Sequence, residues 1–110
     1  MDSPAVHKAA THMLNVVEWD QRGGTEWTHA GLGTDFKEAV IQQQIDAFFS
    51  ENQIYLILGR KDSLDISTKE AARLVRSALA GKSVTLWDHA LTRAIHFNRI
   101  GVFKCGKVSA

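Results

Sequence analysis

The sequence predicts a small α+β fold in which helices pack on one face of a mixed or antiparallel sheet. Apolar residues recur at three- and four-residue steps in three segments, as on the buried side of amphipathic helices. Other segments are continuously apolar or alternate between apolar and polar, as strands do. The expected helices are residues 4–19, 35–50 and 67–81, and the expected strands are residues 54–58, 83–87 and one or two within 94–108. The length of 110 residues predicts a single domain over 1–110.

The first segment predicts an amphipathic helix that begins at Ser3 and Pro4 and ends near Trp19. Serine is a favoured N-cap. Proline is favoured at the first helical position, because the N–H that it lacks would have no partner within the helix. Residues 20–34 follow with no periodicity and with four glycines, which predicts an unusually long loop. Long ordered loops often carry function, so Trp27 is a candidate contact residue; the alternative is that its ring closes the edge of the core.

Two capping boxes predict where the second and third helices begin. Asp35 is followed three residues later by Glu38, and Ser67 is followed in the same way by Glu70. The third helix lies between two expected strands, so we expect a possible βαβ unit at residues 54–87. The helix would then connect two parallel strands of the sheet.

The C-terminal segment predicts antiparallel strands joined by a turn. Ile95 and Phe97 are expected to point inward, with His96 and Asn98 pointing outward, because side chains alternate along a strand. This alternation changes phase near Asn98 and Arg99, which predicts a turn or bulge there.

Charge is divided unevenly along the chain. Residues 1–59 carry three bases and eight acids, a net charge of −5, whereas residues 60–110 carry ten bases and four acids, a net charge of +6. The basic half therefore needs a polyanion, an acidic partner, the acidic half of its own fold, or a second copy of the chain. A sheet covered on one face leaves a second face to bury, so we expect a homodimer.

Composition predicts a cytoplasmic protein. The 45% apolar and 23% charged content is typical of a folded globular protein and unlike a disordered one. No run approaches the roughly 20 apolar residues that cross a bilayer, and the N-terminus has no signal-peptide pattern, so no membrane partner is expected. The single cysteine, Cys105, cannot form an internal disulfide, which is typical of a reducing compartment.

The sequence contains no motif for catalysis, a cofactor or a metal. His7 and His12 are five residues apart and His89 and His96 seven, which is unlike the local ligand spacing of zinc sites. Asp88 precedes His89 directly, and adjacent residues on a strand point to opposite sides rather than forming a dyad. We therefore expect no metal and no cofactor, and no catalytic residue is assigned.

One resemblance supports a nucleic-acid partner. The run from Ser67 to Val75 resembles the first helix of excisionase-type winged helix-turn-helix domains, and the run from Ile95 to Gly101 resembles their wing. The resemblance implies a second, recognition helix after Val75. The sequence departs from the family there, because residues 83–87 favour a strand.

Three classes of function remain open. The first is a non-catalytic binding or accessory protein with an unknown protein or small-molecule partner, with candidate contacts at Trp27, His29, Trp87, His89 and His96. The second is a DNA-binding regulator, with candidate phosphate contacts at Lys69, Arg73, Arg76, Lys82, Arg93 and Arg99. The third is a small enzyme that uses His29, His89 or His96 with a carboxylate from elsewhere in the fold.

Overall fold

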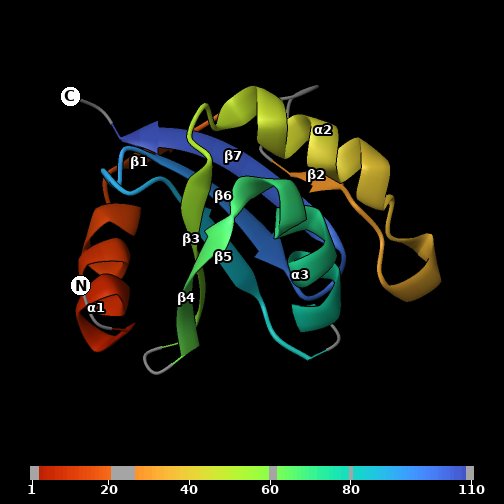
Figure 1. Cartoon of the computed structure of the whole chain (residues 1–110), viewed down its shortest axis with the longest axis horizontal. Coiled ribbons are helices and arrows are strands. Elements are labelled where there is room, and N and C mark those ends of the chain that lie inside the picture. Colours follow the sequence, from red (N-terminus) through yellow and green to blue (C-terminus); the bar gives the residue numbers. More distant parts are fainter. Residues whose placement is uncertain (1–2, 21–26, 60–61, 80, 109–110) are drawn as a thin grey trace.

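The computed structural model of this chain describes residues 3–20, 27–59, 62–79 and 81–108. These residues form an antiparallel sheet with the strand order β1-β7-β6-β5-β3-β4, and β2 pairs with another part of β7 (Figure 1). The helices are α1 Ser3–Leu14, α2 Glu38–Phe48 and α3 Ala71–Ala78, with short 3₁₀ turns at Gly33–Asp35 and Thr68–Glu70. The strands are β1 Val17–Trp19, β2 Thr28–His29, β3 Gln53–Gly59, β4 Asp62–Ser67, β5 Val84–Trp87, β6 Arg93–Asn98 and β7 Val102–Val108. The α+β prediction is confirmed.

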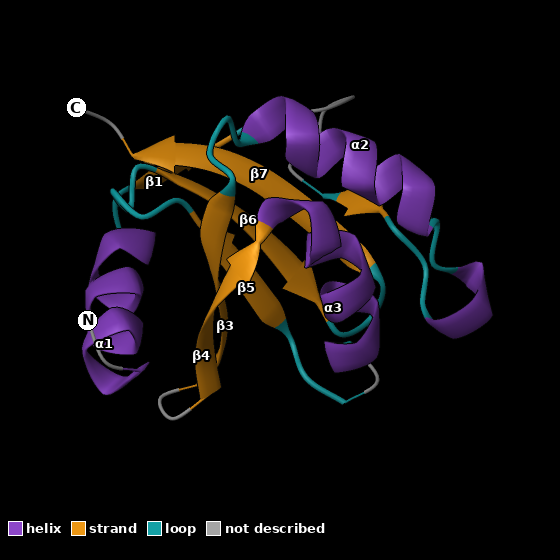
Figure 2. Cartoon of the chain, viewed as in Figure 1, coloured by secondary structure: helices purple, strands orange, loops and turns teal. Residues whose placement is uncertain are grey.

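The main core lies between the sheet and the helices α2 and α3, which pack side by side (Figure 2). Ile45 of α2 and Val75 of α3 are fully buried there. The sheet contributes Leu86, Phe97 and Phe103, and the rings of Phe97 and Phe103 stack with a centroid distance of 5.5 Å. The expectation that helices cover one face of the sheet holds for α2 and α3.

Helix α1 packs on the opposite face of the sheet. Its Val6 and Ala10 are buried against Ile57, Trp87 and Ala94. Side chains alternate along a strand, so Trp87 points away from the main core while its neighbour Leu86 points into it. The sheet is therefore covered on both faces, and α1 makes a second, smaller hydrophobic cluster.

Helix α1 ends five residues earlier than the sequence predicts, and the prediction that it continues to Trp19 is wrong. The helix ends at Leu14, and residues 17–19 form β1, which pairs antiparallel with the end of β7. Helical spacing of Leu14 and Val17 suggested one continuous helix. Tertiary pairing overrides this local pattern because Val17 and Trp19 are also strand-forming residues.

Strand β4 was not predicted from the sequence. The expectation that the third helix connects residues 54–58 and 83–87 as parallel strands is wrong, because β3 and β5 pair antiparallel. Helix α3 instead connects β4 and β5, which both pair antiparallel with β3, so they run parallel to each other with β3 between them. Strand β4 lies at the edge of the sheet and buries only Ile66, with acidic Asp62 and Asp65 exposed. The alternation of apolar and polar residues in β4 is consequently too weak to predict a strand from the sequence.

The winged helix-turn-helix arrangement is not formed. After α3 the chain enters β5, so the expected recognition helix is a strand. The run from Ile95 to Gly101 forms most of β6 and the turn into β7, where Gly101 has a φ of 98°. This turn confirms the break predicted near Asn98. In the expected loop 20–34, β2 pairs with β7, and residues 21–26 lie outside the described residues.

The beginning of α3 is capped from α2 and not by the predicted capping box. Ser67 makes no side-chain capping bond. The Gln42 side chain accepts a hydrogen bond from the Ala72 amide at 3.0 Å and donates one to the Thr68 carbonyl at 2.8 Å. Likewise, Asp35 lies in a 3₁₀ turn and the N-cap position of α2 is Lys37, with no side-chain cap bond. Capping by a residue 30 positions away leaves no local sequence signal.

Replacing Gln42 with alanine is expected to lower the free energy of unfolding by about 1 to 2 kcal/mol. The variant leaves a backbone N–H and a carbonyl at the α2–α3 contact without their partner. Gln43→Ala is the matched control, since Gln43 is exposed in the same helix. Urea unfolding followed by circular dichroism measures both, and equal stabilities of the two variants would contradict the capping role.

Candidate ligand-binding site

The three tryptophans of the chain gather on the α1 side of the sheet. Trp19 of β1 and Trp87 of β5 belong to the cluster that α1 covers. Trp27, which precedes β2, places its ring edge-on to His96 with a centroid distance of 6.1 Å and an interplanar angle of 61°. His96 lies on the same face, because it is one residue out of phase with the core residue Phe97. Residues far apart in the sequence therefore build one aromatic region.

Two adjoining cavities lie in this region. The inner cavity, of about 180 Å³, lies between α1 and strands β3, β5 and β6. The outer cavity, of about 220 Å³, lies beside it and reaches β1 and β7. Leu14 and His96 line both cavities, so the two are compartments of one site. Polar and aromatic side chains of the inner cavity include His7, Ser83, Thr85 and Trp87, and the outer cavity adds Trp19 and Lys104.

Lys104 places a positive charge in the wall of the outer cavity. Its ammonium nitrogen lies 4.3 Å from the centroid of the Trp19 ring and 4.7 Å from that of Trp27. Both distances are within the range of favourable cation–π contacts. Lys104 is directly opposite His96 across the β6–β7 pair, which brings the ammonium and the imidazole to one face.

His96 lies at the boundary of the two cavities, where its surroundings disfavour the charged form of the imidazole. Its Nδ1 is 2.9 Å from the Thr85 hydroxyl oxygen, and Thr85 is its direct neighbour across the β5–β6 pair. Burial lowers the pKa of His96 below its ordinary value of 6.5, and the nearby charge of Lys104 lowers this pKa further. Hence Nε2 is left to bond a ligand, since the described residues provide no hydrogen bond to it.

Trp87 contributes a hydrogen-bond donor without an acceptor. The residue is 0% exposed, lines the inner cavity, and its Nε1–H has no hydrogen-bond partner among the described residues. A buried donor left in this way costs about 1 to 3 kcal/mol, and most buried indole N–H groups are bonded.

The five residues proposed as binding contacts lie in different places. Trp87 and His96 line the inner cavity, and Trp27 contacts the His96 ring. His29 is exposed on β2, outside the lining of both. His89 is exposed in the turn after β5, where Nε2 lies 2.9 Å from the Asp65 carboxylate and the ring stacks on Tyr55.

Four further residues of the site were not predicted from the sequence. Trp19 was assigned to the end of a helix, and Lys104 was one of many bases in the C-terminal half. Thr85 lies two residues before Trp87 and therefore on the same face of the strand. This spacing is the one feature of the sequence that indicates Thr85 as a residue of the site. His7 is on α1, whose position on this face has no local signal.

Most of the basic residues considered as phosphate contacts have partners within the fold, and Arg76 and Arg99 line one hollow. Arg76 binds Glu38 at 3.7 Å and the Gly33 carbonyl at 2.9 Å, which joins the basic half to the acidic half. Arg93 is half-buried and donates to the Phe48 carbonyl at 3.1 Å. Arg73 pairs with Glu70 and Lys82 with Asp62, and Lys69 and Arg99 are exposed. The charge split is therefore compensated in part within the fold.

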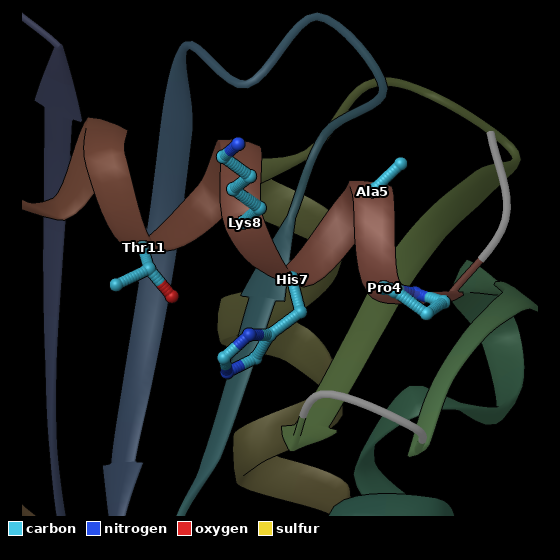
Figure 3. A pocket seen from close by; sticks show the side chains of 5 residues that line it. All are labelled: Pro4, Ala5, His7, Lys8 and Thr11. Atoms are coloured by element: carbon cyan, nitrogen blue, oxygen red, sulfur yellow. The ribbon is translucent and has the colours of Figure 1, made fainter.

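A larger hollow, of about 430 Å³, follows the outside of α1 (Figure 3). His7 and Thr11 point to one side of the helix there, and Ala5 and Lys8 point to the other. All of its lining residues belong to α1, so no second described element closes it.

Within the described part of the chain, no three His, Cys, Asp or Glu side chains are close enough to hold a metal ion together. None of the described helices has the length and apolar character needed to cross a membrane. Comparison with protein-family models, with curated proteins and with solved structures finds no match to this chain.

Proposed function

We propose that the protein is a non-catalytic binding domain that holds a small ligand in the inner and outer cavities. The observation that carries the proposal is that the two cavities adjoin on the α1 face of the sheet, where Leu14 and His96 line both of them. Ligand sites combine an apolar, aromatic wall with a few converging polar groups. Trp19, Trp87 and Leu14 supply that wall here, and His96 and Lys104 supply the polar groups.

The titratable groups of the site support binding rather than catalysis. General acid–base chemistry commonly needs a second group that orients or charges the histidine. The partner of His96 is the neutral Thr85 hydroxyl, and no carboxylate is found among the described residues that line either cavity. The pair of His89 and Asp65 is exposed and lies outside both cavities.

Self-association and a cytoplasmic location are further parts of this proposal. Strand β4 forms an edge of the sheet, and its Leu64 is 52% exposed. An open edge presents unpaired backbone groups that a second copy of the chain can extend, which supports a homodimer. The chain has one cysteine, Cys105, and it is buried, which supports a reducing compartment.

The test is a panel of single-ring planar compounds, acidic, neutral and basic, measured by thermal shift and by tryptophan fluorescence. We expect at least one member to stabilise the protein and to bind about tenfold more weakly to Trp87→Phe, because Trp87 forms part of the wall of the inner cavity. Tyr55→Phe is the control, since Tyr55 is an aromatic residue of the same face outside both cavities.

A second variant keeps this test valid if Trp87→Phe does not fold. Thr85→Val preserves the side-chain shape and removes the hydroxyl that positions the His96 ring. Weaker binding to either variant supports the proposal. A panel without a single binder, or binders that are unaffected by both variants, would overturn it.

A further inference from the structure

We propose that the protein has a second binding site, for a small phosphate monoester, in the hollow between α3, the segment before α2 and the turn that joins β6 to β7. The hollow has a volume of about 370 Å³, and its described lining residues are Leu32, Gly33, Arg76, Leu79, Gly81 and Arg99. None of them lines the inner or the outer cavity, so the inference is independent of the proposed function. Three features carry it: the fixed walls, the two arginine side chains, and the balance of charge.

Hydrogen bonds fix the three walls of the hollow relative to one another. The amides of Ala30 and Gly31 donate to the Gly101 carbonyl at 2.8 Å and 3.0 Å, which joins the segment before α2 to the β6–β7 turn. Gly101 has a φ of 98°, and a Cβ there would lie 3.3 Å from the Gly31 carbonyl carbon, so the two segments are in close contact. Arg76 of α3 donates from Nε to the Gly33 carbonyl at 2.9 Å. The walls are thus in place before a ligand arrives, which lowers the cost of binding.

Arg76 has its guanidinium group oriented by two partners and keeps a free donor. Besides the bond from Nε to Gly33, its Nη1 lies 3.7 Å from the Glu38 carboxylate. The other terminal nitrogen, Nη2, has no hydrogen bond to a described residue, and the side chain is 41% exposed. A guanidinium group presents its N–H donors in a planar fork that matches phosphate oxygens. Arg76 can therefore donate to a ligand without giving up either of its contacts.

Arg99 supplies the second guanidinium group, from the β6–β7 turn. Its backbone amide donates to the Ser83 hydroxyl at 3.2 Å, which fixes the point where the exposed side chain begins. The guanidinium group itself has no hydrogen bond or ion pair with any described residue, so it is available to a ligand. The three terminal oxygens of a phosphate monoester point in different directions, whereas the two oxygens of a carboxylate lie in one plane. Donors on two separate walls therefore suit a phosphate better than a carboxylate.

The charge at the hollow favours an anion. Its described lining residues include two arginines and no acid. The Glu38 carboxylate and the negative end of the α3 dipole act on Arg76, which lies in the last turn of that helix, and both offset its charge. The charge of Arg99 remains in excess, and it attracts an anion.

The other walls favour an organic phosphate over inorganic phosphate. Leu32 and Leu79 add apolar surface to the hollow. Sites for small ligands usually have about 300 to 1,000 Å³ and combine apolar walls with a few polar groups. The hollow is at the lower end of this range, so it suits a phosphate that carries one small apolar group.

The experiment compares phenyl phosphate, methyl phenyl phosphate and benzoate by titration calorimetry. These probes share a ring and carry a phosphate monoester, a phosphate diester and a carboxylate. We expect phenyl phosphate to bind at least about tenfold more tightly than the other two, because it offers three terminal oxygens and a second negative charge. Its affinity should increase from about pH 5 to about pH 7.5, since a monoester loses its second proton near pH 6 while arginine stays charged.

The variant Arg99→Ala tests the site, because the Arg99 side chain has no partner in the fold to lose. We expect it to bind phenyl phosphate at least about tenfold more weakly, as for a hydrogen bond to a charged group. Arg73→Ala is the control, since Arg73 is an exposed arginine of α3 that pairs with Glu70 outside the hollow. In nitrogen-15 NMR spectra, phenyl phosphate should shift the Gly33 amide signal.

Several results would overturn the inference. Equal or tighter binding of the diester or of benzoate would rule out the monoester class, and the diester result would favour the backbone of a nucleic acid. No binding of phenyl phosphate, or equal affinity for Arg99→Ala and Arg73→Ala, would rule out the site. A shift of the Trp87 indole signal with no shift at Gly33 would place phenyl phosphate in the inner cavity instead.

Discussion

Gly106→Ala is expected to detach β1 from β7, to lower the free energy of unfolding by about 2 kcal/mol or more, and to abolish ligand binding. An added Cβ at this position would lie 2.5 Å from Val17 Cγ1, 2.7 Å from the Glu18 carbonyl oxygen and 2.9 Å from Trp19 Cε3. The Glu18 oxygen is backbone within the β1–β7 pair and cannot move without disturbing that pairing. Trp19, which lies across Gly106, would leave the wall of the outer cavity.

The matched control is Gly81→Ala, because an added Cβ at Gly81 meets no atom within 4 Å. Urea unfolding measures the stability of both variants, and tryptophan fluorescence reports the displacement of Trp19. We expect Gly81→Ala to stay within about 0.5 kcal/mol of the parent chain. Equal stability of the two variants would contradict the close approach of β1 at Gly106.

Asp88→Ala is expected to lower the free energy of unfolding by about 3 kcal/mol, because three hydrogen-bond donors lose a buried, charged acceptor. Asp88 is 3% exposed, and its Oδ1 accepts from the Thr92 amide at 2.7 Å and the Arg93 amide at 3.0 Å. Its Oδ2 accepts from the Thr92 hydroxyl. The turn that these bonds hold contains Leu91 with a φ of 57°, a backbone conformation that is strained for leucine.

Two further variants test this role of Asp88. Asp88→Asn keeps an acceptor oxygen, so we expect an intermediate loss of stability. Asp62→Ala removes an exposed carboxylate that pairs with Lys82 at 3.3 Å, and such surface pairs contribute about 0 to 1 kcal/mol. Thermal and urea unfolding give all three values. A loss for Asp88→Ala no larger than that for Asp62→Ala would contradict the account.

The sequence predicts most of the fold because the buried elements have strong periodic patterns. Helices α2 and α3 bury one apolar stripe each, β3 is apolar from Ile54 to Leu58, and β5 is buried at every position. Strands β1 and β4 lie at the edges and take their conformation from their neighbours, so local pattern identifies them poorly. The same applies to Gln42, whose capping role depends on a helix that is distant in sequence.

The candidate site depends on strand register, which explains why only part of it could be predicted. Thr85, His96 and Lys104 are direct neighbours across β5, β6 and β7. Once this register is known, they must share a face with Trp87. From the sequence alone the three positions belong to separate segments, and a shift of one residue would turn each of them toward the main core.

The most direct test of the account is the indole N–H signal of Trp87 in nitrogen-15 NMR spectra. The three tryptophans give three such signals, and Trp87→Phe identifies the one that belongs to Trp87. We expect this signal to shift on addition of a panel compound that stabilises the protein, because Trp87 lines the inner cavity. If such a compound binds and the Trp87 signal stays in place, the ligand lies elsewhere and the proposed site is wrong.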